Sequence, residues 1–272
     1  MISRTEIERL LAEDVPAGDL TTDALGIGHR TGRMTFAARH DMVLAGVEVA
    51  AKMMDALAVS LNASDGDWLP DGTSILEASG RADELHRVWK AAQTLLEILS
   101  GIATATRAVV DAAAPVPVAT TRKTVPGARA LSQLAVPAGG GILHRHGLSE
   151  TILVFPEHRA FLGGESLPDI AARLRRTQPE KALTVEVGTI DEAVEAAVAG
   201  FDVVQLEKFT PDAVAELVGR LPERGKRARL AATGGIDPSN AATYVAAGAD
   251  LIVTSWPYTA RPRDVAVRLF AD

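Results

Sequence analysis

The sequence predicts an α/β protein in which a first α/β domain precedes a barrel of parallel strands. Two patterns support this prediction. Beyond Pro115, short strands rich in Val, Ile and Leu alternate with amphipathic helices, as in parallel sheets that are buried on both faces. Before Pro115, strands, turns and one long helix follow an order typical of a partly antiparallel sheet. A chain of 272 residues with 47% hydrophobic residues is long enough to fill two such cores.

The first domain is predicted over residues 1–112. Its elements are defined by apolar residues at helical spacing and by strand-like runs that turns separate. The expected helices cover 6–13, 47–57 and 84–113, and the expected strands cover 33–38, 42–45 and 73–78. Gly101 is the position at which a kink in the long helix would be expected.

The second domain is predicted over residues 113–257, where strands and helices alternate. The expected strands cover 116–120, 152–155, 183–187, 203–206, 230–232 and 251–254, and the expected helices cover 167–176, 190–199, 211–220 and 238–247. The related stretches 196–204 and 245–253 favour a barrel built from equivalent units, although an open doubly wound sheet has the same alternation. The tail at 258–272 is expected to pack on the first domain.

Composition and charge exclude several classes of protein. The chain has no cysteine, which removes disulfides and thiolate metal sites, and its net charge of −7 argues against nucleic acid as the main partner. The first eleven residues carry charges throughout, and no run of about 18 apolar residues is present to span a membrane. His144, His146 and His158 lack a convincing ligand pattern, so anion binding is favoured over metal chelation. We therefore expect a cytoplasmic protein that binds neither nucleic acid nor membranes.

Functional side chains of a parallel barrel gather at the carboxyl ends of its strands. The residues at these ends are Thr121, Arg122, Lys123, Glu186, Glu207, Lys208, Thr233, Gly234, Gly235, Thr254 and Ser255. Adjacent cations flanked by threonines favour anion binding over a solvated basic face. Glu186 lies in an otherwise apolar strand, so it should pair with a cation or a ligand because an unpaired buried charge is costly.

Two glycine-rich turns are candidates for close approach to an anion. Thr233, Gly234 and Gly235 precede the helix expected at 238–247, whose free N–H groups would suit a phosphate. The glycines at 139–141 precede His144 and Arg145, and they are open to interpretation as a linker or as an anion contact.

Five segments resemble the quinolinate phosphoribosyltransferase family. They are Thr-Arg-Lys-Thr-Val-Pro-Gly-Ala-Arg at 121–129, Gly-Gly-Gly-Ile-Leu-His-Arg-His-Gly-Leu at 139–148, Ala-Thr-Gly-Gly-Ile at 232–236, Glu-Asp-Val-Pro-Ala-Gly-Asp-Leu-Thr-Thr at 13–22 and Leu-Ser-Gly-Ile-Ala-Thr at 99–104. Together they cover nearly the whole chain in the family's order. Within that family, segment 148–161 is similar to the ModD branch, pyrophosphorylases linked to molybdenum transport.

The resemblance implies an α/β sandwich domain followed by an incomplete α/β barrel, the type II phosphoribosyltransferase architecture. It also implies a homodimer with shared active sites, in which a ring nitrogen of a small anionic acceptor attacks 5-phosphoribosyl 1-pyrophosphate with Mg²⁺ present. The resemblance assigns substrate binding to Lys90, Arg122, His144, Arg145, Phe155 and His158, and catalysis to Lys123, Glu186 and Glu207. Both glutamates would face the ribose hydroxyls or the magnesium, directly or indirectly. It assigns phosphate binding to Thr233, Gly234, Gly235, Thr254 and Ser255.

The chain departs from the quinolinate enzymes at several of these positions. Phe155 replaces a lysine and Lys90 replaces an arginine, while Glu207 and Lys208 replace an aspartate–asparagine pair and Ser255 replaces a glycine. Phenylalanine removes a partner for a carboxylate and adds apolar area for a ring, and lysine lacks the bidentate fork of arginine. The first two changes fall on the acceptor side, so they favour an acceptor other than quinolinate.

Three functional hypotheses follow. The leading hypothesis is a phosphoribosyltransferase that acts on a planar anionic heterocycle and is linked to molybdenum transport. The second is a quinolinate phosphoribosyltransferase of NAD biosynthesis, and the third is a non-catalytic protein that binds a nucleotide or an oxyanion such as molybdate. The presence of both Lys123 and Glu186 argues against the third.

Overall fold

The computed structural model describes residues 2–223 and 227–272, which form two compact units. Unit 1 comprises Met1–Arg107, Thr124–Gly140 and Pro257–Asp272, and unit 2 comprises Ala108–Lys123 and Gly141–Trp256. Across the described residues, no helix combines the length and the hydropathy that a bilayer crossing requires.

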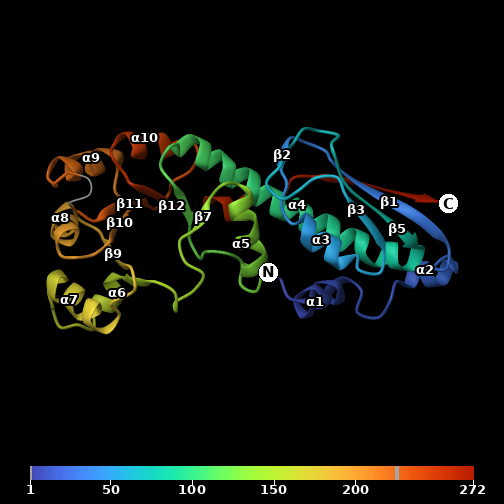
Figure 1. The fold of residues 1–272 in the computed structure, drawn as a ribbon, viewed down its shortest axis with the longest axis horizontal. Helices are drawn as coiled ribbons and strands as arrows, with labels where there is room; N and C mark the ends of the chain where they lie inside the picture. The colour runs from blue at the N-terminus through green and yellow to red at the C-terminus, as the bar shows by residue number, and fades with distance from the viewer. Residues whose placement is uncertain (1, 224–226) are drawn as a thin grey trace. The chain divides into compact units, whose positions relative to one another are not determined.

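Unit 1 is built on a four-stranded antiparallel sheet, and its strands and helices come from three separate parts of the chain (Figure 1). Its strands are β1 (Thr31–Ala38), β2 (Met42–Val43), β3 (Ala58–Leu61), β4 (Trp68–Leu69), β5 (Ser74–Arg81) and β13 (Val265–Ala271). Its helices are α1 (Arg4–Asp14), α2 (Leu20–Leu25), α3 (Val47–Met53), α5 (Arg129–Ala138) and most of α4 (Ala82–Ala113). The sheet order is β13-β1-β5-β3, and β2 pairs with β4 separately.

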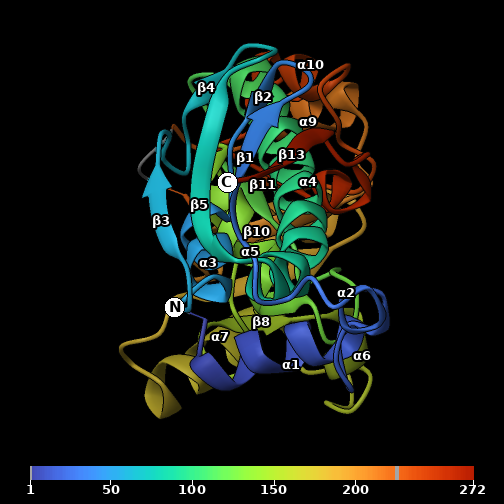
Figure 2. The ribbon, with the colours of Figure 1, turned by 90° about the vertical axis from the view of Figure 1, so that its right-hand side faces the viewer.

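The C-terminal tail completes the sheet of unit 1. Strand β13 pairs antiparallel with β1 from Gly32 opposite Ala271 to Ala38 opposite Val265, and Figure 2 shows these strands beside α4. Gln93 of α4 donates a hydrogen bond to the carbonyl of Val265 at 2.7 Å. Gly101 lies directly against the tail, since a Cβ there would be 2.5 Å from the carbonyl oxygen of Arg261. The close approach of the tail therefore explains Gly101, and α4 continues through it as one helix.

Segment 124–140 packs within unit 1, although the expected boundary placed it in the barrel domain. The buried side chains of α5 include Leu131, Ala135 and Val136. Its C-terminal Gly139 approaches α4 so closely that a Cβ would lie 2.4 Å from the carbonyl oxygen of Ala103. A helix this short finds its partners by tertiary contact, which local sequence patterns do not reveal.

Unit 2 is an open barrel of seven parallel strands in the order β7-β6-β12-β11-β10-β9-β8. The strands are β6 (Val118–Thr120), β7 (Ile142–Leu143), β8 (Ile152–Val154), β9 (Leu183–Val187), β10 (Val203–Glu207), β11 (Arg229–Thr233) and β12 (Leu251–Thr254). The helices are α6 (Pro156–Arg159), α7 (Leu167–Thr177), α8 (Ile190–Val198), α9 (Pro211–Gly219) and α10 (Ala241–Ala246), and the 3-10 turn η1 (Trp256–Thr259) follows β12. Strands β7 and β8 are the two edges, so the incomplete barrel predicted from the sequence is confirmed.

Alternate residues of these strands face opposite sides of the sheet. One set, with Val204, Leu206 and Leu230, packs against the helices α8, α9 and α10 that cover the outer face in Figure 1. The other set lines the inside of the barrel with small apolar residues, including Ala231 and Val253. This inner set becomes polar at the carboxyl ends of the strands, and a site can form there.

Candidate active site

A cavity of about 500 Å³ opens at the carboxyl ends of the barrel strands, within unit 2. It is lined by Thr121, Arg122, Lys123, His144, Arg145, Leu153, Phe155, Glu157, His158, Glu186, Gln205, Glu207, Thr233 and Val253. The cavity therefore combines cations, carboxylates and aromatic rings, and its volume falls within the range typical of small-molecule sites.

Strand register explains why the acidic residues meet. Glu186 lies opposite Gln205 on the neighbouring strand, and Glu207 lies opposite Thr233 on the next. Gln205 and Glu207 are two residues apart, so both point to the inner face. The side-chain amide of Gln205 donates a short hydrogen bond to the Glu186 carboxylate. The parallel sheet thus builds a polar cluster from residues on three strands.

Glu186 is the carboxylate whose acidity the pocket changes. Burial raises the pKa of Glu186, and the nearby charges of Glu207 and Glu157 raise it further. The hydrogen bond from Gln205 and the charge of Lys123 oppose this rise in pKa. The pocket itself therefore disfavours the ionised form of Glu186, and a positively charged substrate centre would stabilise that form.

The basic side of the pocket contains a buried arginine. Arg145 is 6% exposed, and among the described residues it forms no ion pair. Its guanidinium carbon lies 5.7 Å from the centroid of the Phe155 ring. Burial lowers the pKa of Arg145, and the neighbouring charge of Arg122 lowers it further. Two adjacent cations without a carboxylate partner form a site that an anionic ligand would stabilise.

His144 lies beside these cations and is held through its backbone, which donates a hydrogen bond to the carbonyl of Thr120 at 3.1 Å. Burial lowers the pKa of His144, and the charge of Arg145 lowers it further. The imidazole is therefore neutral at pH 7, where it can donate or accept one hydrogen bond without adding charge.

Phe155 and His158 form the aromatic wall of the pocket. Their ring centroids lie 5.8 Å apart with an interplanar angle of 23°, a stacked arrangement. The backbone N–H of Phe155 donates to Nδ1 of His158 at 3.0 Å, which fixes the ring at the start of α6. With Nδ1 accepting this bond, Nε2 of His158 is the nitrogen left to face a ligand.

The glycine turn after β11 has a left-handed backbone. Gly234 and Gly235 have φ angles of +96° and +72°, a conformation that L-residues rarely adopt. Gly234 lies against Lys208, since a Cβ there would be 2.8 Å from Cγ of that lysine. Of the turn, Thr233 lines the cavity.

Two features expected at the phosphate end differ in the structure. Thr254 is 4% exposed, and its hydroxyl donates to the carbonyl of Ile236 at 2.6 Å and accepts from the backbone of Trp256 at 3.0 Å. Thr254 therefore holds the neighbouring loops together, and neither it nor Ser255 lines the cavity. Helix α10 begins at Ala241, later than expected, because the side chain of Asn240 bonds back to the carbonyl of Gly235 at 3.0 Å.

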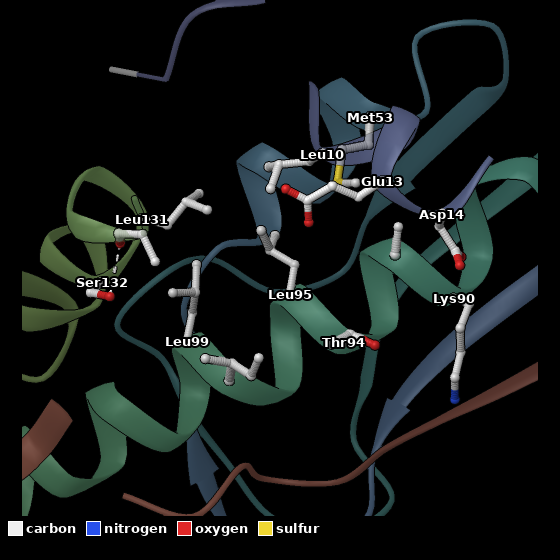
Figure 3. A pocket seen from close by; sticks show the side chains of 13 residues that line it. Leu10, Glu13, Asp14, Met53, Lys90, Thr94, Leu95, Leu99, Leu131 and Ser132 are labelled. Carbon is white, nitrogen blue, oxygen red and sulfur yellow. Dashed lines mark hydrogen bonds between the residues drawn. The ribbon is translucent and has the colours of Figure 1, made fainter. Parts of the chain in front are cut away.

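Lys90 lies on α4 in unit 1 and is not among the residues that line the barrel cavity. Its ammonium group lies 3.1 Å from Oε1 of Gln93. Lys90 borders a separate apolar pocket of about 400 Å³ in unit 1, together with Ile98 and Leu131 (Figure 3). Figure 3 shows Lys90 and Asp14 at one end of this pocket and Leu131 at the other.

The carboxylates of the barrel pocket fit a magnesium ion only if a substrate supplies further oxygens. The described part of the chain contains no group of three or more His, Asp or Glu side chains arranged to hold a metal, so His144, His146 and His158 do not form one. Glu186 and Glu207 provide two carboxylates in the same pocket. Mg²⁺ is usually held by one or two carboxylates together with substrate phosphates. The pair therefore suits a magnesium ion that arrives with a phosphorylated substrate.

Sequence reasoning missed Gln205 and Glu157 among the polar residues of the pocket. Gln205 could have been found, because it is the polar residue of an apolar strand and precedes Glu207 by two positions. Glu157 carried no comparable signal, since it lies in a loop-to-helix segment whose direction the sequence does not specify.

Comparison with known proteins gives matches along most of the chain. The family model described as quinolinate phosphoribosyl transferase, N-terminal domain, matches residues 19–100, and that of the C-terminal domain matches residues 102–268. A relative from Rhodobacter capsulatus named "Putative pyrophosphorylase ModD" is 44% identical over 248 residues, which cover 89% of this chain and 95% of the relative. A protein of Archaeoglobus fulgidus named "Probable nicotinate-nucleotide pyrophosphorylase", carboxylating, is 34% identical and covers 89% of this chain and 94% of its own. The crystal structure of NadC from Streptococcus pyogenes superimposes with a TM-score of 0.90 at 29% identity, covering 98% of this chain and 96% of that one.

Proposed function

The chain belongs to the quinolinate phosphoribosyltransferase family, and from this premise we propose that it transfers the phosphoribosyl group of 5-phosphoribosyl 1-pyrophosphate to a ring nitrogen of a planar anionic heterocycle. Within the family it is ModD-like, and its enzyme class is that of the pentosyltransferases. The observation that carries the proposal is Arg145, a buried cation that lies beside Arg122 and forms no ion pair among the described residues. An anionic acceptor would supply the negative charge that pairs with Arg145.

In the proposed reaction, the ring nitrogen forms a bond to C1 of the ribose as the bond from C1 to the pyrophosphate oxygen breaks. Pyrophosphate leaves with the electron pair of that bond, and positive charge develops on the ribose. Glu186 and Glu207 line the cavity and would stabilise this positive charge as carboxylate anions. Lys123 would lie between the acceptor and the leaving pyrophosphate.

The other cavity residues would position the two substrates. Arg122, His144 and Arg145 would hold the acid of the acceptor, with His158 and Phe155 against its ring. Thr233 and the turn at Gly234 and Gly235 would hold the 5-phosphate. Magnesium bound with the donor would supply charge neutralisation at the pyrophosphate, with Glu186 and Glu207 as its protein ligands, directly or through water.

We further propose that the enzyme is a homodimer in which Lys90 serves the active site of the second copy. Lys90 belongs to unit 1 and the cavity to unit 2, and membership of the family, for which shared active sites are expected, supports this role. It borders the apolar pocket of unit 1, where Ile98 is 46% exposed. Apolar surface of this kind is typical of a face that a partner covers. A link to molybdenum transport is part of the proposal and is supported by similarity to ModD proteins.

The second candidate is a quinolinate phosphoribosyltransferase, and the cations on the basic side of the cavity favour it. Arg122, His144 and Arg145 all line the cavity, as that reaction would require. Phe155 stands against it, because a phenylalanine ring occupies the wall where a second carboxylate would need a cation.

Calorimetry and turnover together would test the proposal. The wild-type protein should bind the phosphoribosyl donor with Mg²⁺, and a panel of pyridine, pyrimidine and pterin carboxylates should give thermal stabilisation for at least one acceptor. Arg122→Ala should lose the acceptor-dependent stabilisation and keep the unfolding transition of the free protein. Unchanged acceptor binding by this variant would place the acceptor site elsewhere, and robust turnover of quinolinate would favour the second candidate.

A further inference from the structure

Glu157 is an acidic group on the acceptor side of the barrel cavity that the proposed reaction does not use. It lies between Phe155 and His158 on the segment that follows β8, and it lines the cavity with both of them. Among the described residues, Glu157 forms no ion pair. The nearest cation along the chain, Arg159, is engaged elsewhere, since its guanidinium bonds to Glu192 at 2.9 Å. The charge of Glu157 is therefore not cancelled by a partner on its own segment.

The charges that line the cavity are balanced before any substrate binds. The permanent cations are Arg122, Lys123 and Arg145, and the carboxylates are Glu157, Glu186 and Glu207. A phosphorylated donor adds further negative charge and would compete for the same three cations. An acceptor with two carboxylates would therefore add more uncompensated negative charge to the cavity than an acceptor with one acid.

The walls of the acceptor side also differ in the hydrogen bonds they can offer. Arg122 and Arg145 are donors alone, so they select an acid. Glu157, when ionised, is an acceptor alone, so it selects an amino group or a ring N–H. The stacked rings of Phe155 and His158 lie next to it and suit the face of a planar ring. The acidic group, the planar ring and the N–H group must then belong to one ligand.

We propose, on the basis of the proposed function, that the acceptor is a planar heterocycle with one acidic group and one amino or ring N–H group. The acid binds to Arg122 and Arg145, and the N–H group donates to Glu157. Glu157 is thus a specificity-determining residue. It accepts a hydrogen bond from an N–H group on the ring and repels a second carboxylate at the same position.

The test compares matched acceptors in the presence of the phosphoribosyl donor analogue and Mg²⁺. The probes are nicotinate, quinolinate and 2-aminonicotinate, which differ by one substituent at the same ring position. Titration calorimetry on the full chain gives the affinity of each, and a separate titration of the donor with Mg²⁺ tests the proposed function. The variants are Glu157→Gln and, as a matched control, Glu180→Gln, which alters an exposed glutamate that is not among the residues lining the cavity.

For the wild type we expect 2-aminonicotinate to bind about tenfold more tightly than nicotinate, the size of one charge-assisted hydrogen bond, and quinolinate to bind most weakly. Glu157→Gln should reduce the tenfold ratio to about twofold, since the amide has lost its charge. Glu180→Gln should keep the wild-type ratio. Phe155→Lys should improve binding of quinolinate relative to nicotinate, because it restores a cation to the wall.

Three outcomes would overturn the proposal, and they are distinguishable. If the donor binds but 2-aminonicotinate binds no more tightly than nicotinate, the acceptor class is wrong and the proposed function stands. If the preference for 2-aminonicotinate survives in Glu157→Gln, Glu157 does not determine the specificity, and the proposed function again stands. If the donor does not bind with Mg²⁺, the proposed function fails and this inference fails with it.

Discussion

Replacing Arg145 with methionine should make the free protein more stable while removing its affinity for an acidic acceptor. Arg145 is 6% exposed and forms no ion pair among the described residues. The neighbouring charge of Arg122 also disfavours its cationic form, as the lowered pKa of Arg145 shows. Methionine fills a similar volume without a charge that must be desolvated. Because buried charges are often replaced by apolar side chains with a gain, we expect about 1–2 kcal/mol of additional stability.

Urea and thermal unfolding would measure this gain. For a chain of this size, 1 kcal/mol corresponds to about 2–4 °C in Tm, so a rise of several degrees is expected. Calorimetry with an acceptor that binds the wild type should show a loss of at least about tenfold in affinity. A variant that is less stable than the wild type and still binds the acceptor would refute the reasoning. It would mean that Arg145 is a structural residue whose charge the protein itself compensates.

Three further predictions follow from the same geometry. Lys208 has a φ of 57°, and Gly234 packs against it. Lys208→Gly should therefore relieve backbone strain and raise the free energy of unfolding in urea by up to about 1 kcal/mol. A loss of stability would show that the lysine side chain matters more than the strain. Thr254→Val should destabilise the protein by about 1–3 kcal/mol, because the carbonyl of Ile236 loses its hydrogen-bond donor. A loss of affinity for 5-phosphoribosyl 1-pyrophosphate without destabilisation would instead assign Thr254 to the phosphate site. Burial and the charge of Arg145 lower the pKa of His144 in the folded state, so its contribution to stability is present above the unfolded pKa and is lost as pH falls through the folded pKa. Between pH 7.5 and 5, the free energy of unfolding should therefore fall more steeply with acid in the wild type than in His144→Gln, and equal slopes would contradict the assignment.

The sequence was sufficient for the architecture of the barrel because its signals are local. Strands such as β9 and β10 are short apolar runs, and glycines with positive φ at 200 and 248 follow the helices that precede the next strands. Segment 124–140 was expected in the barrel domain but packs within unit 1. Its apolar residues indicate that one face of the helix is buried, and they do not indicate which domain buries it. The contact of Gly139 with α4 depends on the tertiary structure.

The candidate site shows the same limit at the level of single residues. The rule that function gathers at strand ends selected Glu186, Glu207 and Thr254 alike. The register separates them, because Thr254 follows the inward-facing Val253 and so points to the opposite face. Lys90 was predicted from its place in a motif, and a motif does not say which copy of a chain uses the residue.

Acceptor-dependent release of pyrophosphate from 5-phosphoribosyl 1-pyrophosphate tests the central proposal most directly. The measurement uses the wild-type chain with Mg²⁺ and planar heterocyclic acids that bind it, and mass spectrometry of the acceptor accompanies it. We expect release only when an acceptor is present, a gain of one phosphoribosyl group on that acceptor, and a loss of at least about a hundredfold in rate for Glu186→Gln. Saturable binding of an anion without release of pyrophosphate for any acceptor would contradict the account and favour a binding protein.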